Sequence, residues 1–380
     1  MNRSFKLWTI RGINVRMHIT FPLILVWAAL QFGVMARGGI GGAIMGLIAI
    51  LILFGIVLLH ELGHSLAAQH YDVEVKQIVL LPIGGVAELA RIPENPKEEF
   101  VIAIAGPVAN VFIAFFMIFL GLLAGFDLGI SRTPLIFAGL SRISVERIFD
   151  YVFVSNLFLL AFNLIPAFPL DGGRMFRALL ASRMSYARAT VTAGVIGQGL
   201  ALLLGVWGLR NFNLIWVFIA IFIYVGASHE RKSVRIRSRM AGVKVSQAYS
   251  KGIPSLYANS TVLDALGVTR QTSHSHFSLN EGDQYVGLIS REDLIDAVEM
   301  SRSGVPLQEL RIKERPAIHL QDDLREAQSL LDEYDLTALP VIESGKFLGL
   351  LSVKNIEEAL RLTTKPPHLR PHPSDGQISS

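Results

Sequence analysis

The chain has 380 residues, of which 51% are hydrophobic and only 17% are charged. Its mean hydropathy of +0.46 is too high for an ordinary soluble protein, so part of the chain is expected to lie in a membrane. The formal net charge of +4 comes from short arginine-rich stretches beside apolar runs, which indicates membrane topology rather than a nucleic-acid partner.

Six apolar segments of spanning or near-spanning length are predicted as transmembrane helices. In chain order they run from about Met17 to Ala36, Gly41 to Gln69, Val101 to Ala124, Ile148 to Ile165, Thr190 to Leu209 and Phe212 to Ala227. The first segment has no evident small-residue cleavage site and further spans follow it, so we expect an uncleaved anchor rather than a secretory signal.

Lysine and arginine residues beside the spans predict the orientation, because these residues are retained in the cytoplasm. With the N-terminus inside, the inner loops hold sixteen of them. The outer loops hold five, which are Arg37, Arg132, Arg142, Arg147 and Arg210. We therefore expect a multi-pass protein of the cell membrane with both termini in the cytoplasm.

The second span ends in VLLHELGHSLAAQHY, residues 57–71, which contains three ionisable groups in an otherwise apolar helix. His60 and His64 are four residues apart and project from one helix face, with Glu61 beside them. In this HExxH arrangement two imidazoles hold zinc and the glutamate is the general base. The alternative is an interfacial helix end with incidental polar residues. Against it, a charged side chain in hydrocarbon costs about 2.5–3.5 kcal/mol.

A catalytic zinc site usually has three protein ligands, and the chain has no cysteine to supply one. The best candidate is Asp171 in NLIPAFPLDGG, residues 163–173, where prolines end the fourth span and two glycines allow close approach. The second and fourth spans run in the same direction, so their C-terminal ends lie at similar depth near the inner leaflet. This matched depth favours a metal ligand over a plain turn residue.

Asn163 lies eight residues before Asp171, inside the apolar part of the fourth span. Two interpretations are open for its amide. It could form a hydrogen bond with a neighbouring helix, or it could hold a substrate carbonyl or its oxyanion.

From about residue 241 to residue 362 the chain becomes charged and repeats itself at a spacing of 62 residues. Matched pairs include Pro254 with Pro316, Ala265 with Ala327, Gly287 with Gly349 and Ser290 with Ser352. Each copy is predicted to form a helix, a hairpin and a closing helix, and the two copies to complete one another's core. Residues 363–380, which are rich in proline and serine, are predicted as a disordered tail.

HELGH in the second span, together with NLIPAFPLDGG after the fourth, resembles the site-2 protease family of intramembrane zinc metalloproteases. The likeness covers most of residues 1–228 and includes GINVRMHITF, LLPIGGVAEL and AGPVAN. It implies zinc held by His60, His64 and Asp171, with Glu61 as catalytic base and Asn163 as a polar aid to substrate or transition state. It also implies a single-span membrane protein as substrate. No PDZ-like insertion separates the two motifs, which disfavours the branch with such domains.

The soluble half resembles a pair of cystathionine-β-synthase (CBS) domains, which occur appended to six-span members of that family. Their adenosine-binding pattern is present in full as GLISRED, residues 287–293. The resemblance implies that Ser290 and Asp293 contribute to a site for ATP, ADP or AMP, with phosphate at the helix N-terminus. It also allows a homodimer through the CBS domains. Asn355 replaces the aspartate in the second copy, and the alternative for Ser290 and Asp293 is a helix capping box.

The predicted fold is a multi-pass α-helical membrane protein with six transmembrane helices and short β-hairpin elements, followed by a soluble α+β tandem CBS domain. The expected domains are 1–228 (transmembrane zinc metalloprotease), 229–240 (basic linker), 241–300 and 301–362 (CBS domains) and 363–380 (tail). LLPIGGVAEL, residues 80–89, is predicted as a strand that could pair with an unwound substrate, or alternatively as a re-entrant hairpin that shields the site.

Two functions remain open for this arrangement. The first is an intramembrane zinc endopeptidase biased by nucleotide on the CBS pair, through the linker. The second is a CBS-gated channel or transporter with the histidines along an ion path. An inactive relative would require a damaged motif, whereas these motifs are intact. The basic stretch SHERKSVRIRSRM could instead be a lipid-facing anchor.

Overall fold

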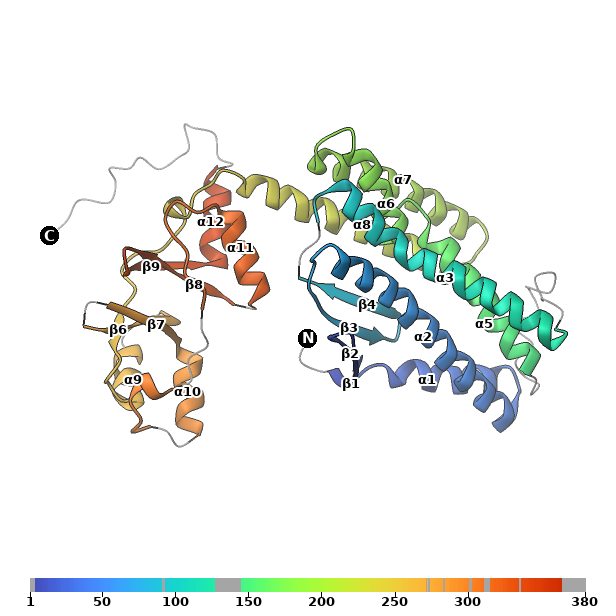
Figure 1. Ribbon diagram of the computed structural model, residues 1–380, viewed down its shortest axis with the longest axis horizontal. Helices are drawn as coiled ribbons and strands as arrows, with labels where there is room; N and C mark the ends of the chain where they lie inside the picture. Colours follow the sequence, from blue (N-terminus) through green and yellow to red (C-terminus); the bar gives the residue numbers. More distant parts are fainter. Residues whose placement is uncertain are drawn as a thin grey trace. The chain divides into compact units, whose positions relative to one another are not determined.

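The structure, a computed structural model, describes residues 4–363 apart from 91–92, 127–144, 271, 273, 283, 301–302, 311–314 and 335. It divides into two compact units, Met1–Val234 and Arg235–Ser380 (Figure 1). Arg91, Arg132 and Arg142 of the predicted loops, and the predicted tail beyond Thr363, lie outside the described residues.

The first unit contains a four-stranded sheet with the strand order β1-β2-β3-β4. The strands are β1 Ser4–Ile10, β2 Ile13–His18, β3 Val75–Leu81 and β4 Gly84–Leu89. β2 and β3 are parallel, whereas the other two pairs are antiparallel. The alternating buried residues of β2, Ile13 and Val15, are fully shielded, as expected for a strand with one covered face. The sheet therefore joins the N-terminal hairpin to the hairpin after the second predicted span, and β4 is an edge.

The helices of this unit pack as long, largely apolar rods (Figure 1). They are α1 Pro22–Ala29 with its π-helical continuation η1 Leu30–Met35, α2 Gly39–His70, α3 Pro96–Ala124, α5 Val145–Asn163, α6 Asp171–Ala181, α7 Tyr186–Arg210 and α8 Leu214–Met240. α2 and α3 approach closely at Gly63, where a Cβ would lie 2.7 Å from the Ala105 carbonyl oxygen. Small residues at such crossings are typical of helix packing in membranes.

The prediction of six spans is not confirmed. Among the described residues, four helices are long and apolar enough to cross a membrane: α2, α3, α7 and α8. The first predicted span was wrong at its start, because Met17 lies in β2 and only Pro22–Met35 is helical. The fourth corresponds to α5, whose first turns carry Glu146, Arg147 and Asp150 and so fall short of an apolar span.

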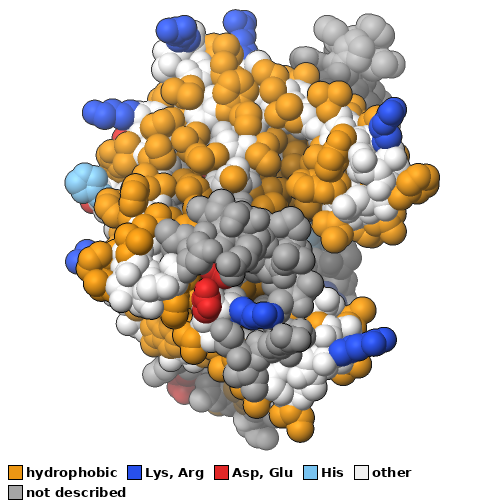
Figure 2. Space-filling view, turned by 90° about the vertical axis from the view of Figure 1, so that its right-hand side faces the viewer, with side chains coloured by type: hydrophobic (Ala, Val, Ile, Leu, Met, Phe, Trp, Pro, Cys, Tyr) orange, Lys and Arg blue, Asp and Glu red, His pale blue; other side chains and the backbone are white. Residues whose placement is uncertain are grey.

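Large hydrophobic side chains cover much of the described surface of the helical unit. Figure 2 shows one face on which hydrophobic side chains predominate. Phe112, Phe115 and Phe119 of α3 are each more than half exposed. Because soluble proteins rarely expose contiguous apolar surface of this extent, the helical unit fits a lipid environment.

The second unit contains two copies of one motif, as the 62-residue repeat predicts. The first copy comprises β5 Ser255–Tyr257, α9 Val262–Arg270, β6 His276–Glu281, β7 Gln284–Ser290 and α10 Arg291–Glu299. The second comprises α11 Leu324–Glu333, β8 Ala338–Glu343, β9 Lys346–Ser352 and α12 Val353–Thr363. Both therefore have the predicted order of helix, hairpin and closing helix.

The two copies exchange short segments that complete their cores. Val245 and Ala248, which precede the first copy, pack in the hydrophobic cluster of the second. Leu307, which precedes the second copy, packs in the cluster of the first. Residues 229–240, predicted as a basic linker, are helical and form the C-terminal part of α8.

A buried histidine connects the two copies. The Nε2 atom of His276 on β6 lies 3.2 Å from the Thr337 hydroxyl, next to β8. Burial, with the added effect of the Arg315 cation and against that of Asp293, lowers the pKa of His276 to about 4. The imidazole is therefore neutral in the folded unit at neutral pH.

This neutral state predicts a loss of stability in acid. An unfolded histidine titrates near pH 6.5, so between that pH and about pH 4 the unfolded chain binds more protons than the folded one, and the free energy of unfolding falls as the pH drops. From His276 we expect a loss of about 2 kcal/mol between about pH 7 and about pH 4.5. Pulse proteolysis of the full chain in urea should show a weaker acid dependence for His276→Gln than for the wild type. Equal dependence in both would contradict this assignment.

Candidate metal centre and active site

Three potential metal ligands converge between α2 and α6. His60 and His64 lie one turn apart on α2, and Asp171 is the first residue of α6. The Oδ2 atom of Asp171 lies 3.1 Å from Nε2 of each histidine, and the two Nε2 atoms are 3.1 Å apart. The structure thus brings together the three predicted ligands. Among the described residues, they form the group of His, Asp or Glu side chains that is close enough to hold one metal ion.

The separations match a metal site better than a hydrogen-bonded one. Three ligands of a tetrahedral zinc ion, with bonds of about 2.0–2.1 Å, lie about 3.3 Å from one another. Two ring nitrogens and one oxygen that all face a single point cannot all be joined by hydrogen bonds, since too few protons are available. The donor set of two imidazoles and one carboxylate is also one that zinc commonly takes in catalytic sites. The residues present therefore fit zinc.

A backbone contact orients one of the two histidine rings. The Nδ1 atom of His64 lies 2.7 Å from the Ile102 carbonyl oxygen on α3. A ring N–H at Nδ1 donates to this oxygen, so the lone pair of Nε2 points at the cluster, as metal ligation requires. His60 is also buried, and its Nδ1 has no hydrogen-bond partner among the described residues. Its orientation depends on packing instead.

Glycines allow the surrounding backbone to come close to the ligands. A Cβ on Gly106 of α3 would lie 2.2 Å from His64 Nε2 and 2.7 Å from His60 Cε1. At the start of α6, a Cβ on Gly172 would lie 2.3 Å from the Ile165 carbonyl oxygen. The two glycines after Asp171 belong to the predicted site, whereas Gly106 was not predicted to lie there. Its AGPVAN motif was the available signal, and only the helix packing shows its contact with the histidines.

Glu61 is held by the edge strand of the sheet. Its Oε2 atom accepts a hydrogen bond of 3.1 Å from the backbone N–H of Ala87 on β4. A Cβ on Gly85 would lie 2.6 Å from Glu61 Cγ, so the glycine leaves room for this side chain. LLPIGGVAEL is not the single predicted strand: it contains the end of β3, a turn at Pro82 and Ile83, and β4. The hairpin alternative is therefore the correct one for its secondary structure.

Asn163 is close enough to act at the same site. It is the last residue of α5, and its Nδ2 lies 3.4 Å from His60 Nε2. Its amide thus faces the three candidate ligands, at the limit of a hydrogen-bond distance. The neighbouring-helix interpretation and the substrate interpretation both remain compatible with this position.

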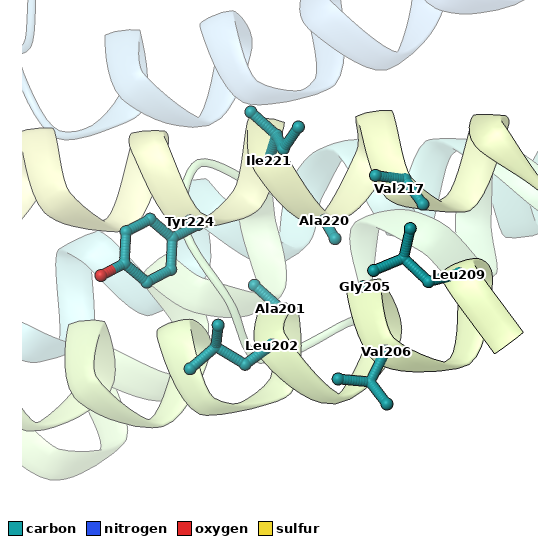
Figure 3. Close-up of a pocket in the computed structure, with 9 residues that line it drawn as sticks. All are labelled: Ala201, Leu202, Gly205, Val206, Leu209, Val217, Ala220, Ile221 and Tyr224. Atoms are coloured by element: carbon teal, nitrogen blue, oxygen red, sulfur yellow. The ribbon is translucent and has the colours of Figure 1, made fainter.

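An apolar pocket of about 340 Å³ lies elsewhere in the unit, between α7 and α8 (Figure 3). Its lining consists of Ala201, Leu202, Gly205, Val206, Leu209, Val217, Ala220, Ile221 and Tyr224. None of these residues carries a carboxylate or an imidazole. The groups that could activate water are therefore in the histidine and aspartate cluster and not in this pocket.

The two predicted nucleotide-binding residues cap a helix in the second unit. Ser290 accepts a hydrogen bond from the Asp293 N–H, and Asp293 accepts one of 2.8 Å from the Ser290 N–H. The capping-box alternative is thus confirmed. Asp293 also lies 3.5 Å from the Arg315 guanidinium, with its side chain 45% exposed. In the second copy the Ser352 N–H and hydroxyl donate to Asn355 Oδ1, which caps the start of α12 in a similar way.

Comparisons with known proteins find relatives for both parts of the chain. A family model for peptidase family M50 matches residues 48–206, and one for the CBS domain matches residues 245–300 and 308–362. A zinc metalloprotease of Methanocaldococcus jannaschii is 30% identical over 363 residues, which cover 95% of this chain and 97% of the relative. Stage IV sporulation protein FB of Bacillus subtilis is 31% identical over 183 residues, which cover 46% and 57%. The solved site-2 protease of M. jannaschii, 36% identical, covers 60% of this chain and 95% of its own, with a TM-score of 0.44.

The close approach of Gly106 predicts that a single methyl group there disrupts metal binding. In Gly106→Ala the added Cβ would displace the His60 and His64 rings, so we expect bound zinc after dialysis to fall by about tenfold or more. The matched control is Gly55→Ala, because Gly55 is an exposed glycine of α2 whose Cβ would meet nothing within 4 Å. Elemental analysis should find wild-type zinc in that control. Full zinc content in Gly106→Ala would refute the assignment.

Proposed function

The chain belongs to peptidase family M50, the zinc metalloproteases of site-2 protease type, and carries a tandem CBS pair; from this membership we propose that it cleaves a transmembrane segment of membrane-protein substrates. The observation that carries the proposal is the convergence of His60, His64 and Asp171 within 3.1 Å, at the end of an apolar helix. Ionisable groups in such a helix are costly and are by default functional.

The residues around the cluster suggest their own roles in hydrolysis. Zinc, when bound by His60, His64 and Asp171, supplies a Lewis acid that activates water for attack on a peptide carbonyl. Glu61 takes the proton of that water and later gives it to the leaving amine. The Ala87 N–H that donates to Glu61 fixes the carboxylate for this transfer. Asn163 Nδ2, which faces the cluster, donates to the oxyanion that forms on the carbonyl.

The edge strand β4 offers a place for an unwound substrate. A transmembrane helix hides its carbonyls in internal hydrogen bonds and must unwind locally, after which its backbone needs new partners. Within the described part of the chain β4 is paired on one side only, and the Ala87 N–H points away from β3 toward Glu61. An extended substrate segment that pairs along this edge would pass beside the catalytic base. This supports strand addition as the docking mode.

The proposal includes a multi-pass arrangement with both termini in the cytoplasm. It is supported by the excess of lysine and arginine in the loops assigned to the inside, an assignment that requires the Pro22–Met35 segment and α5 to cross the membrane beside the four helices of spanning length. Water would then reach the zinc site from the cytoplasmic side, toward which the C-terminal end of α2 lies.

The catalytic role of Glu61 predicts a variant that binds metal but does not cleave. Glu61→Gln keeps the size and the hydrogen-bond acceptor for Ala87 but cannot take a proton, so we expect cleavage to fall by at least about 10²-fold with zinc content unchanged. The measurement uses the full chain in liposomes with a single-span substrate, and product mapped by mass spectrometry. Equal cleavage by both forms would contradict the role of Glu61 as the catalytic base. Absence of cleavage by the wild type, together with ion transport across the membrane, would favour a channel or transporter instead.

We also include adenine-nucleotide binding by the CBS pair in the proposal. GLISRED supports it, as do the exposed carboxylate of Asp293 and the start of α10 immediately after Ser290. The ribose would compete with Arg315 for the Asp293 carboxylate. Such binding could bias the enzyme only if the nucleotide favours one arrangement of the chain over another.

An isosteric variant tests the nucleotide site without loss of the helix cap. Asn355 shows that an asparagine at this position still caps the helix, so Asp293→Asn should fold normally but lose the charge that accepts from ribose. We expect AMP, ADP or ATP to bind the full chain about 10-fold to 100-fold more weakly in this variant. Calorimetric titration provides the measurement. Absence of binding to the wild type at millimolar nucleotide would remove this part of the proposal.

A further inference from the structure

A buried arginine lies on the same helix as the candidate ligand Asp171. Arg177 of α6 is 0% exposed and is the largest fully buried side chain among the described residues. Arginine is almost never fully buried without a partner, because removing its charge from water is costly. It follows the Asp171 ligand by six residues, yet the proposed chemistry gives it no role.

Arg177 is surrounded by charged and aromatic partners. Its Nε donates to Glu99 Oε1 at 2.8 Å, and Nη2 donates to the same oxygen. Its Nη1 donates to Glu230 Oε1. The guanidinium also lies 4.9 Å from the ring centroid of Phe168 and 4.8 Å from that of Tyr186. One cation thus binds two carboxylates and two rings.

These partners come from the elements that build the metal site. Glu99 is in the first turn of α3, and Gly106, which contacts both histidines, lies seven residues later on the same face. Phe168 is in the segment that leads into Asp171. Arg177 therefore fastens the helix that carries Asp171 to the helix that lies against His60 and His64.

The remaining partner, Glu230, belongs to α8, which reaches the ligand segment at a second point. A Cβ on Gly226 would lie 2.5 Å from Cδ of Pro169, two residues before Asp171. Gly226 and Glu230 are four residues apart and so share one face of α8. α8 thus contacts the Asp171 segment at one point and Arg177 at another.

The two carboxylates differ in exposure. The side chain of Glu99 is 0% exposed, whereas that of Glu230 is 27% exposed. Water can therefore replace the Glu230 contact more readily than the Glu99 contact. Among the two, the α8 contact is the one that can open while α6 stays fastened to α3.

We propose that Arg177 is a positioning residue, which holds α6 so that Asp171 completes the metal site, and that its pairing with Glu230 makes this position depend on α8. The inference rests on the proposed metalloprotease function. It gives α8 a role in metal affinity that does not require α8 to touch the metal.

The test measures zinc affinity of the full chain in detergent by competition with a chelator. Arg177→Gln should weaken zinc binding by about 10-fold to 100-fold, as for other residues that orient metal ligands. Arg177→Lys keeps the positive charge but loses the planar guanidinium that donates to both glutamates at once. It should weaken zinc binding less than Arg177→Gln does. The matched control is Arg183→Gln, since Arg183 is exposed in the turn after α6, and its affinity should equal that of the wild type. Wild-type affinity in folded Arg177→Gln would overturn the proposal.

Glu230→Gln keeps the proposal testable if Arg177→Gln does not fold. This variant preserves side-chain volume at a partly exposed site. It should weaken zinc binding about threefold, because it removes only one of the two carboxylates that hold Arg177. In the Arg177→Lys background, Glu230→Gln should have a smaller effect on zinc affinity. The two side chains act through one shared contact, so the effects of their substitutions do not add. Additive effects, or no effect of Glu230→Gln, would overturn the role of α8.

The wild type and Glu61→Gln accompany these measurements as references. Failure of the wild type to bind zinc or to cleave the substrate would contradict the proposed function itself, and retained cleavage in Glu61→Gln would contradict the role of Glu61 in it. Zinc binding by the wild type, loss of cleavage in Glu61→Gln and unchanged zinc affinity in the Arg177 variants would contradict only the positioning role.

Discussion

Asp171 lies 3.1 Å from the Nε2 atoms of both His60 and His64, and the first unit is arranged around this contact. A carboxylate oxygen and two ring nitrogens that face one point have too few protons to satisfy one another, and in an apolar surrounding the unmatched groups are costly. A cation at that point removes the conflict. The fold must therefore hold α2 and α6 close together, although hydrogen bonds between their side chains alone do not favour this approach. Gly106 permits the approach because it leaves space beside the histidine rings.

Two polar groups at the site are oriented by backbone atoms, and the helices around it are joined by ion pairs. His64 donates to the Ile102 carbonyl and Glu61 accepts from the Ala87 N–H, so an α3 turn and a strand edge fix the two groups. Arg177 of α6 forms ion pairs with Glu99 of α3 and Glu230 of α8, so opposite charges meet where these three helices pack. The ion pairs of Arg177 thus join the three helices.

Local patterns predicted much of the fold and the three metal-type residues. The HExxH spacing on a helix, and the proline and glycine signals around Asp171, depend only on nearby sequence, and the structure places these side chains together. Hydropathy predicted α2 and α7 closely but extended the first span into β2, because Met17 at the end of that strand is apolar and lies close to the apolar run of α1. It also ended the last span at Ala227, since charge stops a hydropathy run but does not stop a helix. The parallel pairing of β2 with β3, and the Arg177 contacts, join residues far apart in the chain and had no local signal.

X-ray absorption at the zinc edge of the purified full chain identifies the atoms that bind the metal. We expect one zinc per chain with two imidazole nitrogens and one carboxylate oxygen, at distances of about 2.0–2.1 Å, and no sulfur, since the chain lacks cysteine. His64→Ala should remove one of the imidazole contributions. A spectrum with only oxygen ligands, or one unchanged in His64→Ala, would contradict this ligand set.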